Sequence, residues 1–149
     1  MKLTKDLKIA IVSGEFWEEI VGNLEKHCLE TLNRKGIENN QVEIVRVPGS
    51  FEIPLAVKKM AKKNIYDAII AFGAIHKGKT YHFELIANEC ARACMSLSLE
   101  FGVPVIFEVL AVYNIQDAVD RSMQIKDNRG AEAAAAALAM IEALSEIKK

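Results

Sequence analysis

Short runs rich in Val, Ile and Ala alternate along the chain with longer segments in which apolar residues recur every three or four positions. Runs of the first kind are typical of buried strands, and the helical spacing predicts amphipathic helices. The predicted strands are residues 7–13, 42–47, 67–73 and 103–110. The predicted helices are residues 20–32, 51–63, 82–101, 114–123 and 130–147, the first of which is stopped at Gly36.

Strands that alternate with helices favour right-handed crossovers, a parallel sheet and helices on both of its faces. We therefore expect an α/β fold in one domain, residues 1–149: a three-layer α/β/α sandwich with a four-stranded parallel sheet, flavodoxin-like. Ligands of such folds bind outside the carboxyl ends of the strands. The loops expected to meet there are residues 13–17, 48–52, 73–82 and 110–114.

The charge balance argues against a macromolecular anion as partner. Lys and Arg (19) nearly equal Asp and Glu (20), so no global field attracts nucleic acid or an anionic membrane. No window approaches the ~20 apolar residues of a membrane span, and the N-terminus lacks the apolar core of a signal peptide. These features predict a soluble, cytoplasmic protein.

Cysteine spacing gives little support for a metal site. Cys28, Cys90 and Cys94 each fall on the apolar face of a predicted helix, where buried thiols are common. Cys90 and Cys94 are one turn apart and could share a metal, but a structural zinc needs four ligands and no second pair stands nearby. We expect buried thiols and no metal.

The most informative loop follows the third predicted strand. It holds Gly78, Lys79 and Thr80, and a helix opens directly after it. A helix start presents unpaired N–H groups and a positive dipole end, so this loop is a candidate phosphate site. His82 lies beside it and is a candidate proton carrier. A loop with Gly and a capping Thr is equally common in α/β proteins that bind nothing there.

The same segment has a second interpretation, as a nucleotide-binding P-loop. Residues 73–80, Gly-Ala-Ile-His-Lys-Gly-Lys-Thr, match G-x-x-x-x-G-K-[ST] between a predicted strand and helix. Such a protein also needs an acidic residue near Mg²⁺ at the end of a neighbouring strand, and Glu108 is the candidate.

Four segments together resemble a known family. They are Val-Pro-Gly-Ser-Phe-Glu-Ile-Pro (47–54), Gly-Ala-Ile-x-Lys-Gly-x-Thr-x-His-Phe (73–83), Val-Pro-Val-Ile-Phe-Glu-Val-Leu (103–110) and Asp-Asn-Arg-Gly-Ala-Glu-Ala-Ala (127–134). From about Leu7 onward the chain resembles the 6,7-dimethyl-8-ribityllumazine synthases, the penultimate enzymes of riboflavin synthesis. In that family the position of Lys79 is variable, which makes the P-loop match a coincidence.

The resemblance implies a reaction without a cofactor, in which 5-amino-6-(D-ribitylamino)uracil condenses with 3,4-dihydroxy-2-butanone 4-phosphate. His82 would carry protons, Phe16 would stack on the pyrimidine and Phe107 would come from a neighbouring subunit. The implied aminopyrimidine and ribityl ligands are Phe16, Ser50, Phe51, Glu52, Ala74, Ile75, His76 and Phe107. The implied butanone phosphate ligands are Lys79, Thr80, Arg121 and Arg129.

The resemblance also implies a homo-pentamer, which in some members assembles further into a 60-subunit icosahedral shell. The connector 124–129 carries no insertion of the kind seen in pentamer-only members, so the 60-subunit shell remains an alternative to the pentamer. The N-terminal edge strand that members lend to a neighbour's sheet would here be residues 1–4, or absent.

The chain departs from the family pattern around both substrates. The departures are Glu15, Trp17, His76, Ala111, Val112 and Ile125. Trp17 would be either a second stacking surface for the substrate or a side chain that fills the pocket. The alternative to a synthase is a non-catalytic homologue that binds flavin or lumazine, or that only forms a shell, because fold alone does not fix function.

Overall fold

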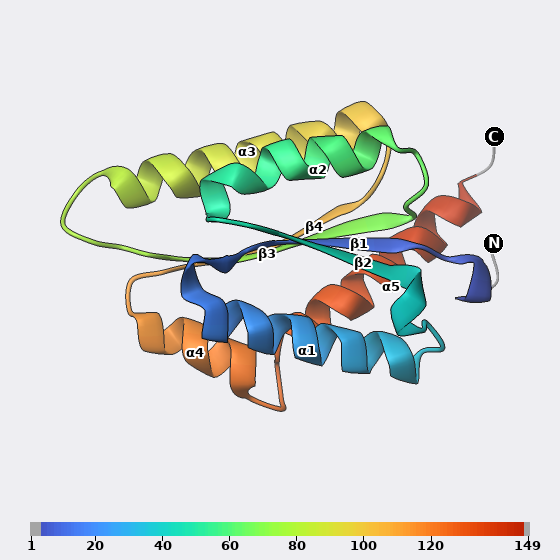
Figure 1. Ribbon diagram of the computed structural model, residues 1–149, viewed down its shortest axis with the longest axis horizontal. Helices are drawn as coiled ribbons and strands as arrows, with labels where there is room; N and C mark the ends of the chain where they lie inside the picture. The colour runs from blue at the N-terminus through green and yellow to red at the C-terminus, as the bar shows by residue number, and fades with distance from the viewer. Residues whose placement is uncertain (1–3, 148–149) are drawn as a thin grey trace.

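Four parallel strands form the middle layer of the structure, a computed structural model that describes residues 4–147 (Figure 1). The strands are β1 (Ile9–Gly14), β2 (Val42–Val47), β3 (Ala68–His76) and β4 (Val105–Val112), paired in the order β2-β1-β3-β4. The expected four-stranded parallel sheet is thus confirmed. β2 and β4 are its edges, and β1 and β3 are its buried centre.

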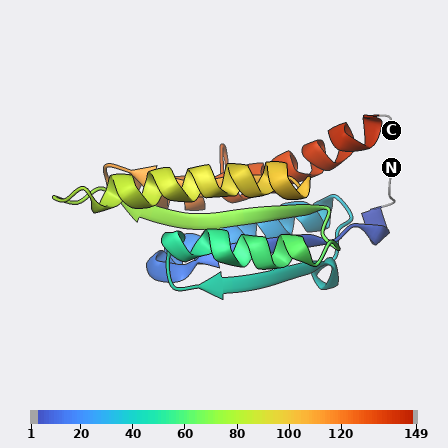
Figure 2. The same ribbon diagram turned by 90° about the horizontal axis from the view of Figure 1, so that it is seen from above.

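Helices cover both faces of this sheet, as the alternating pattern predicts (Figures 1 and 2). One face carries α1 (Glu18–Arg34), α4 (Ile115–Met123) and α5 (Arg129–Glu146). The other carries α2 (Ile53–Lys62) and α3 (His82–Phe101). Four single-turn 3₁₀ helices complete the described residues: η1 (Thr4–Asp6), η2 (Glu15–Trp17), η3 (Asn39–Gln41) and η4 (Ser50–Glu52).

The helix boundaries follow local signals in the sequence. After α1, Gly36 adopts φ +90°, a conformation that favours glycine, so the predicted stop is confirmed. The side chain of Asn114 accepts a hydrogen bond from the Gln116 amide and opens α4, and Asn128 does the same for α5. In contrast, the expected start of the second helix at Phe51 is replaced by η4, and α2 begins at Ile53.

The third strand is longer than the sequence predicts. It continues past Gly73 to His76, because Ala74, Ile75 and His76 pair with Leu110, Ala111 and Val112 of β4. The connecting loop is therefore only residues 77–81. Pairing with a neighbouring strand outweighs the weakening effect that a glycine has inside a strand.

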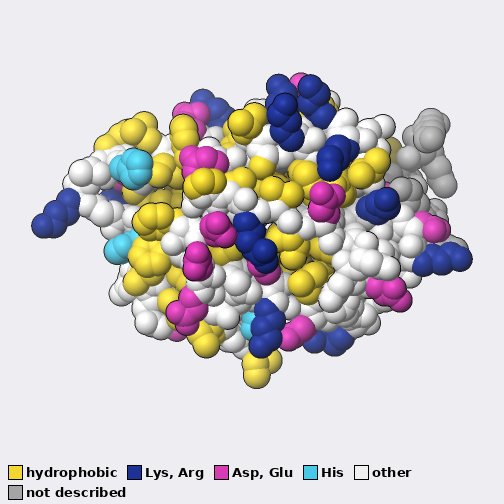
Figure 3. All heavy atoms as spheres, viewed as in Figure 1, with side chains coloured by type: hydrophobic (Ala, Val, Ile, Leu, Met, Phe, Trp, Pro, Cys, Tyr) yellow, Lys and Arg dark blue, Asp and Glu magenta, His cyan; other side chains and the backbone are white. Residues whose placement is uncertain are grey.

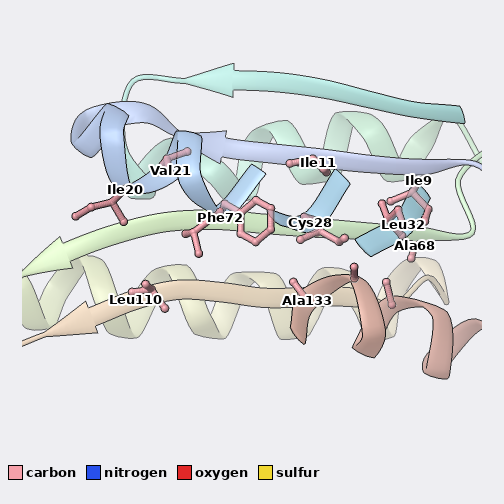
Figure 4. Packing of buried hydrophobic residues seen from close by; sticks show 14 of the residues in the cluster. Ile9, Ile11, Ile20, Val21, Cys28, Leu32, Ala68, Phe72, Leu110 and Ala133 are labelled. Atoms are coloured by element: carbon pink, nitrogen blue, oxygen red, sulfur yellow. The ribbon is translucent and has the colours of Figure 1, made fainter. Parts of the chain in front are cut away.

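Alternating residues of the sheet pack against the two helical layers. Ile11 and Phe72 belong to the cluster that includes Val21 and Cys28 of α1, shown in Figure 4. All three cysteines are buried and free, as predicted, and burial together with the nearby Glu25 raises the pKa of the Cys28 thiol to about 12. Among residues 4–147, no three His, Cys, Asp or Glu side chains gather where a metal could bind.

Two further expectations concern an N-terminal edge strand and a membrane-spanning helix. Residues 1–3 of the proposed N-terminal edge strand lie outside the described residues, and Thr4 begins η1 rather than a strand. Within the described part of the chain, every helix is too short or too polar to cross a bilayer.

Candidate active site

A cavity of about 590 Å³ opens at the carboxyl ends of the strands, where the α/β fold predicts a ligand. It is lined by residues 16–17 of η2, 48–52 between β2 and α2, 74–76 at the end of β3, and 82, 85 and 86 of α3. Figure 3 shows apolar and histidine side chains gathered near the left end of the molecule, beside the first turns of α3. Three of the four expected loops thus contribute, whereas residues 110–114 do not line the cavity.

Aromatic rings from two strand ends form one side of the cavity. The Phe16 ring is 75% exposed and contacts Trp17 edge-on, with centroids 5.6 Å apart. Trp17 in turn meets His76 edge-on at 6.5 Å. An aromatic ring that is exposed inside a cavity offers its face to a flat ligand, so Phe16 is available for stacking.

The polar turn 48–52 lies close against the end of β1 and the backbone of β3. A Cβ at Gly73 would lie 2.6 Å from Ser50 Oγ, and one at Gly14 would lie 2.8 Å from the Gly49 carbonyl carbon. Only glycine at both positions lets the turn approach so closely. Ser50 is buried by this approach, while Phe51 and Glu52 stay exposed on the cavity wall.

A buried carboxylate ties together the two strands that lead into these loops. Glu25 of α1 accepts hydrogen bonds from Ser13 Oγ of β1 at 2.7 Å and from Arg46 of β2 at 2.8 Å. Ser13 and Arg46 are partners in the sheet register. The hydrogen bond and charge of Glu25 raise the pKa of Arg46. The network fixes β1 and β2 one residue before each chain turns toward the cavity.

The start of α3 has little side-chain capping. Its N-cap residue, Tyr81, makes no side-chain cap, and Thr80 Oγ1 accepts only one long bond, 3.4 Å, from the His82 amide. An α-helix leaves its first amide donors without helical partners, and they suit an anion. Lys79 and Thr80 are exposed beside this helix start, and the adjacent His82 lines the cavity.

Five of the expected ligands do not line the cavity: Lys79 and Thr80 lie in the exposed loop before α3, and Phe107, Arg121 and Arg129 belong to other elements. Phe107, 37% exposed, is on the edge strand β4. Arg121 of α4 contacts Asp117, through its carbonyl at 3.1 Å and its carboxylate at 3.8 Å. Arg129 of α5 forms ion pairs with Glu108 at 3.2 Å and Glu132 at 2.6 Å.

The P-loop interpretation does not fit this geometry. Residues 73–76 are paired in the sheet rather than wrapped as a phosphate-binding loop. Glu108, the candidate acid for Mg²⁺, is held by Arg129. Burial raises the pKa of Glu108, although the Arg129 charge acts in the opposite direction.

Sequence reasoning assigned no role to several residues of the cavity wall. Pro48 and Gly49 precede the predicted binding turn, and Leu85 and Ile86 follow His82 by one turn of helix. Leu85, like Met95 and Leu99, is a large apolar residue outside the buried face of α3. That mismatch is a signal that could have identified it.

The sequence matches the model of a known enzyme family, and this match is consistent with the cavity described above. The family model of 6,7-dimethyl-8-ribityllumazine synthase matches residues 6–145, almost the whole chain. The chain belongs to this family. Membership in the lumazine synthase family implies a transferase of riboflavin biosynthesis that acts on small molecules and is oligomeric. It also accounts for a cavity at the strand ends that combines aromatic, polar and helix-terminal surfaces.

Proposed function

We propose that the protein condenses 5-amino-6-(D-ribitylamino)uracil with 3,4-dihydroxy-2-butanone 4-phosphate to give 6,7-dimethyl-8-ribityllumazine, phosphate and water. The observation that carries this proposal is the composition of one cavity. It joins the exposed ring of Phe16 and the polar turn at Ser50 to a helix start that bears His82. A flat heterocycle, a polyol chain and a phosphate each find a suitable surface there.

The aminopyrimidine lies on Phe16 in this proposal. β1 pairs with β3 only as far as Phe72, so the β3 edge at residues 74–76 has no β1 partner and is available to the uracil ring. The ribityl hydroxyls reach Ser50, Phe51 and Glu52, whose carboxylate can accept several hydrogen bonds. Ala74, Ile75 and His76 supply backbone donors and acceptors.

The sugar phosphate binds at the opening of α3. Thr80 donates its hydroxyl, Lys79 adds charge, and the first amides of the helix complete the anion site. This arrangement holds the butanone carbonyl near the aminopyrimidine. Positioning of two reactive substrates can supply up to ~7–11 kcal/mol of the acceleration. His82 transfers protons during imine formation, phosphate elimination and ring closure.

A neighbouring subunit completes the site. Phe107, Arg121 and Arg129 do not line the cavity of their own chain, and we propose that they face the cavity of the next subunit in a homo-pentamer. Large apolar side chains lie exposed on α3, on β4 and just beyond β4: Leu85, Met95, Leu99, Phe107 and Tyr113. Such a surface fits a subunit interface, and a closed ring repeats the same contact at every step. Light scattering decides between the pentamer and a 60-subunit shell.

An assay with both substrates tests the proposed activity. We expect the absorbance and fluorescence of the lumazine to appear, together with one phosphate released per product. A protein that binds lumazine or flavin but forms no product would instead be the non-catalytic homologue. ATP hydrolysis without lumazine formation would favour the P-loop interpretation.

A further inference from the structure

Lys77 joins three elements around the loop that precedes α3. Its ammonium lies 2.9 Å from Glu84 Oε1 in the first turn of α3. It also lies 6.0 Å from the ring centroid of Phe83 and 5.4 Å from that of Tyr113, just beyond β4. The Lys77 amide donates to the Val112 carbonyl at 2.9 Å. One residue therefore connects the ends of β3 and β4 with the beginning of α3.

The rest of this loop has few anchors. Among the described residues, Lys79 makes no ion pair, and the one side-chain hydrogen bond of residues 78–81 is the long contact between Thr80 and the His82 amide. Residues 76–82 are all exposed. The shape of the loop thus depends on the contacts of Lys77 at one end and on α3 at the other.

From these contacts we propose that Lys77 is a positioning residue, which clamps loop 77–81 against the first turn of α3 so that Thr80 and the helix amides form a phosphate site. This inference rests on the proposed function for its ligand. It assigns to Lys77 no contact with the substrate. Lys77 does not line the cavity, and its charge is already directed to a carboxylate and two aromatic faces.

The electrostatics agree with a lasting ion pair. The hydrogen bond between the two groups raises the pKa of Lys77 and lowers that of Glu84. Both groups therefore keep their charges through the neutral range. An exposed ion pair contributes little by itself, but here two cation–π contacts act on the same ammonium.

Two substitutions remove the clamp from its two sides. We expect Lys77→Met and Glu84→Gln each to speed amide hydrogen exchange at Leu85, whose amide donates to the Tyr81 carbonyl, by about five- to tenfold. Each should raise the KM for the butanone phosphate by a similar factor and leave the KM for the aminopyrimidine unchanged. Lys77→Arg keeps the charge and should retain the behaviour of the original protein.

The matched control is Lys63→Met. Lys63 forms an ion pair of similar exposure with Glu43, at 3.6 Å, and does not line the cavity. Its removal should change neither the exchange at Leu85 nor either KM. The comparison separates an effect on the loop from a general loss of one surface cation.

Two results would overturn the inference, and a third would overturn the proposed function instead. Unchanged exchange in both clamp variants would show that the ion pair does not hold the loop. A raised KM in Lys77→Met but not in Glu84→Gln would make Lys77 a direct phosphate ligand. A wild-type protein that forms no lumazine would refute the proposed function, while the exchange measurement would still decide whether Lys77 clamps the loop.

Discussion

At the scale of single residues, groups held in place by their neighbours support a cavity whose wall carries exposed rings. Ser50 is buried beneath its own turn, and Ser13 and Arg46 are fixed by Glu25. Phe16 and His82 are exposed on the cavity wall and keep their ring surfaces for a ligand. This division suits a site that accelerates a reaction mainly by positioning two substrates, with few side chains that take part directly in the bond changes.

Replacement of His82 by alanine should slow turnover without abolishing it. The substitution removes a proton carrier, whose usual contribution is ~10²–10⁴-fold, and leaves the positioning surfaces intact. The rate of lumazine formation measures the effect. His27→Ala is the matched control, because His27 lies on α1, where it contacts Glu30. Complete loss of activity in a folded His82→Ala protein would contradict the importance of positioning.

The fluorescence of Trp17 should report ligand binding. It is the one tryptophan of the chain and lines the cavity between Phe16 and His76. An aminopyrimidine that stacks on Phe16 would change the surroundings of the indole, so we expect saturable quenching during titration. Trp17→Phe should remove this signal while the cavity persists. Emission that is unaffected by saturating ligand would count against binding at this place.

At the scale of elements, one ion pair connects the edge strand to the last helix. Glu108 of β4 is largely buried and meets Arg129 at the first turn of α5. The P-loop interpretation assigned Glu108 a different role, as an acidic residue near Mg²⁺. Glu108 and Arg129 are 21 positions apart in the chain, so only the packing of α5 on β4 reveals that the Arg129 guanidinium pairs with the Glu108 carboxylate.

The burial of Glu108 should make the free energy of unfolding depend on pH. Its pKa is raised by burial above the ordinary carboxyl value of about 4.3. The folded protein then holds this proton more tightly than the unfolded chain does. The resulting stabilisation is complete below the unfolded pKa and is lost as pH rises through the raised value.

The free energy of unfolding of Glu108→Gln should therefore equal that of the original protein near pH 4 and be larger at pH 7. Urea unfolding at fixed protein concentration measures this difference. Glu132→Gln, which contacts the same guanidinium from a more exposed position, should show no such gain. A Glu108→Gln protein less stable than the original at pH 7 would mean that the Arg129 pair outweighs the cost of burial.

At the scale of the whole molecule, the proposed site residues belong to separate parts of the subunit. The cavity opens among η2, the turn 48–52 and α3, whereas Phe107 and Arg121 belong to β4 and α4. A ring of identical subunits brings such separate surfaces together, because each contact joins unlike faces of two copies. The exposed apolar residues of α3 and β4 are suited to that contact.

Subunit mixing tests this arrangement. His82→Ala and Arg121→Ala should each have low activity alone. When they are unfolded together and reassembled at equal amounts, about one site in four receives both intact residues if these come from adjacent subunits. We expect activity to recover toward that fraction. No recovery above the sum of the two separate proteins would assign His82 and Arg121 to the same subunit.

The sequence by itself determined the element types, their order and the buried cysteines, because hydrophobic periodicity and capping residues act over a few neighbouring positions. It also carried the family motifs that name the candidate site residues. The tertiary structure alone decided where β3 ends, how closely Ser50 crosses Gly73, and that Trp17 meets His76. These features depend on strand order and register, which bring residues far apart in the chain into contact, and no local pattern specifies such contacts.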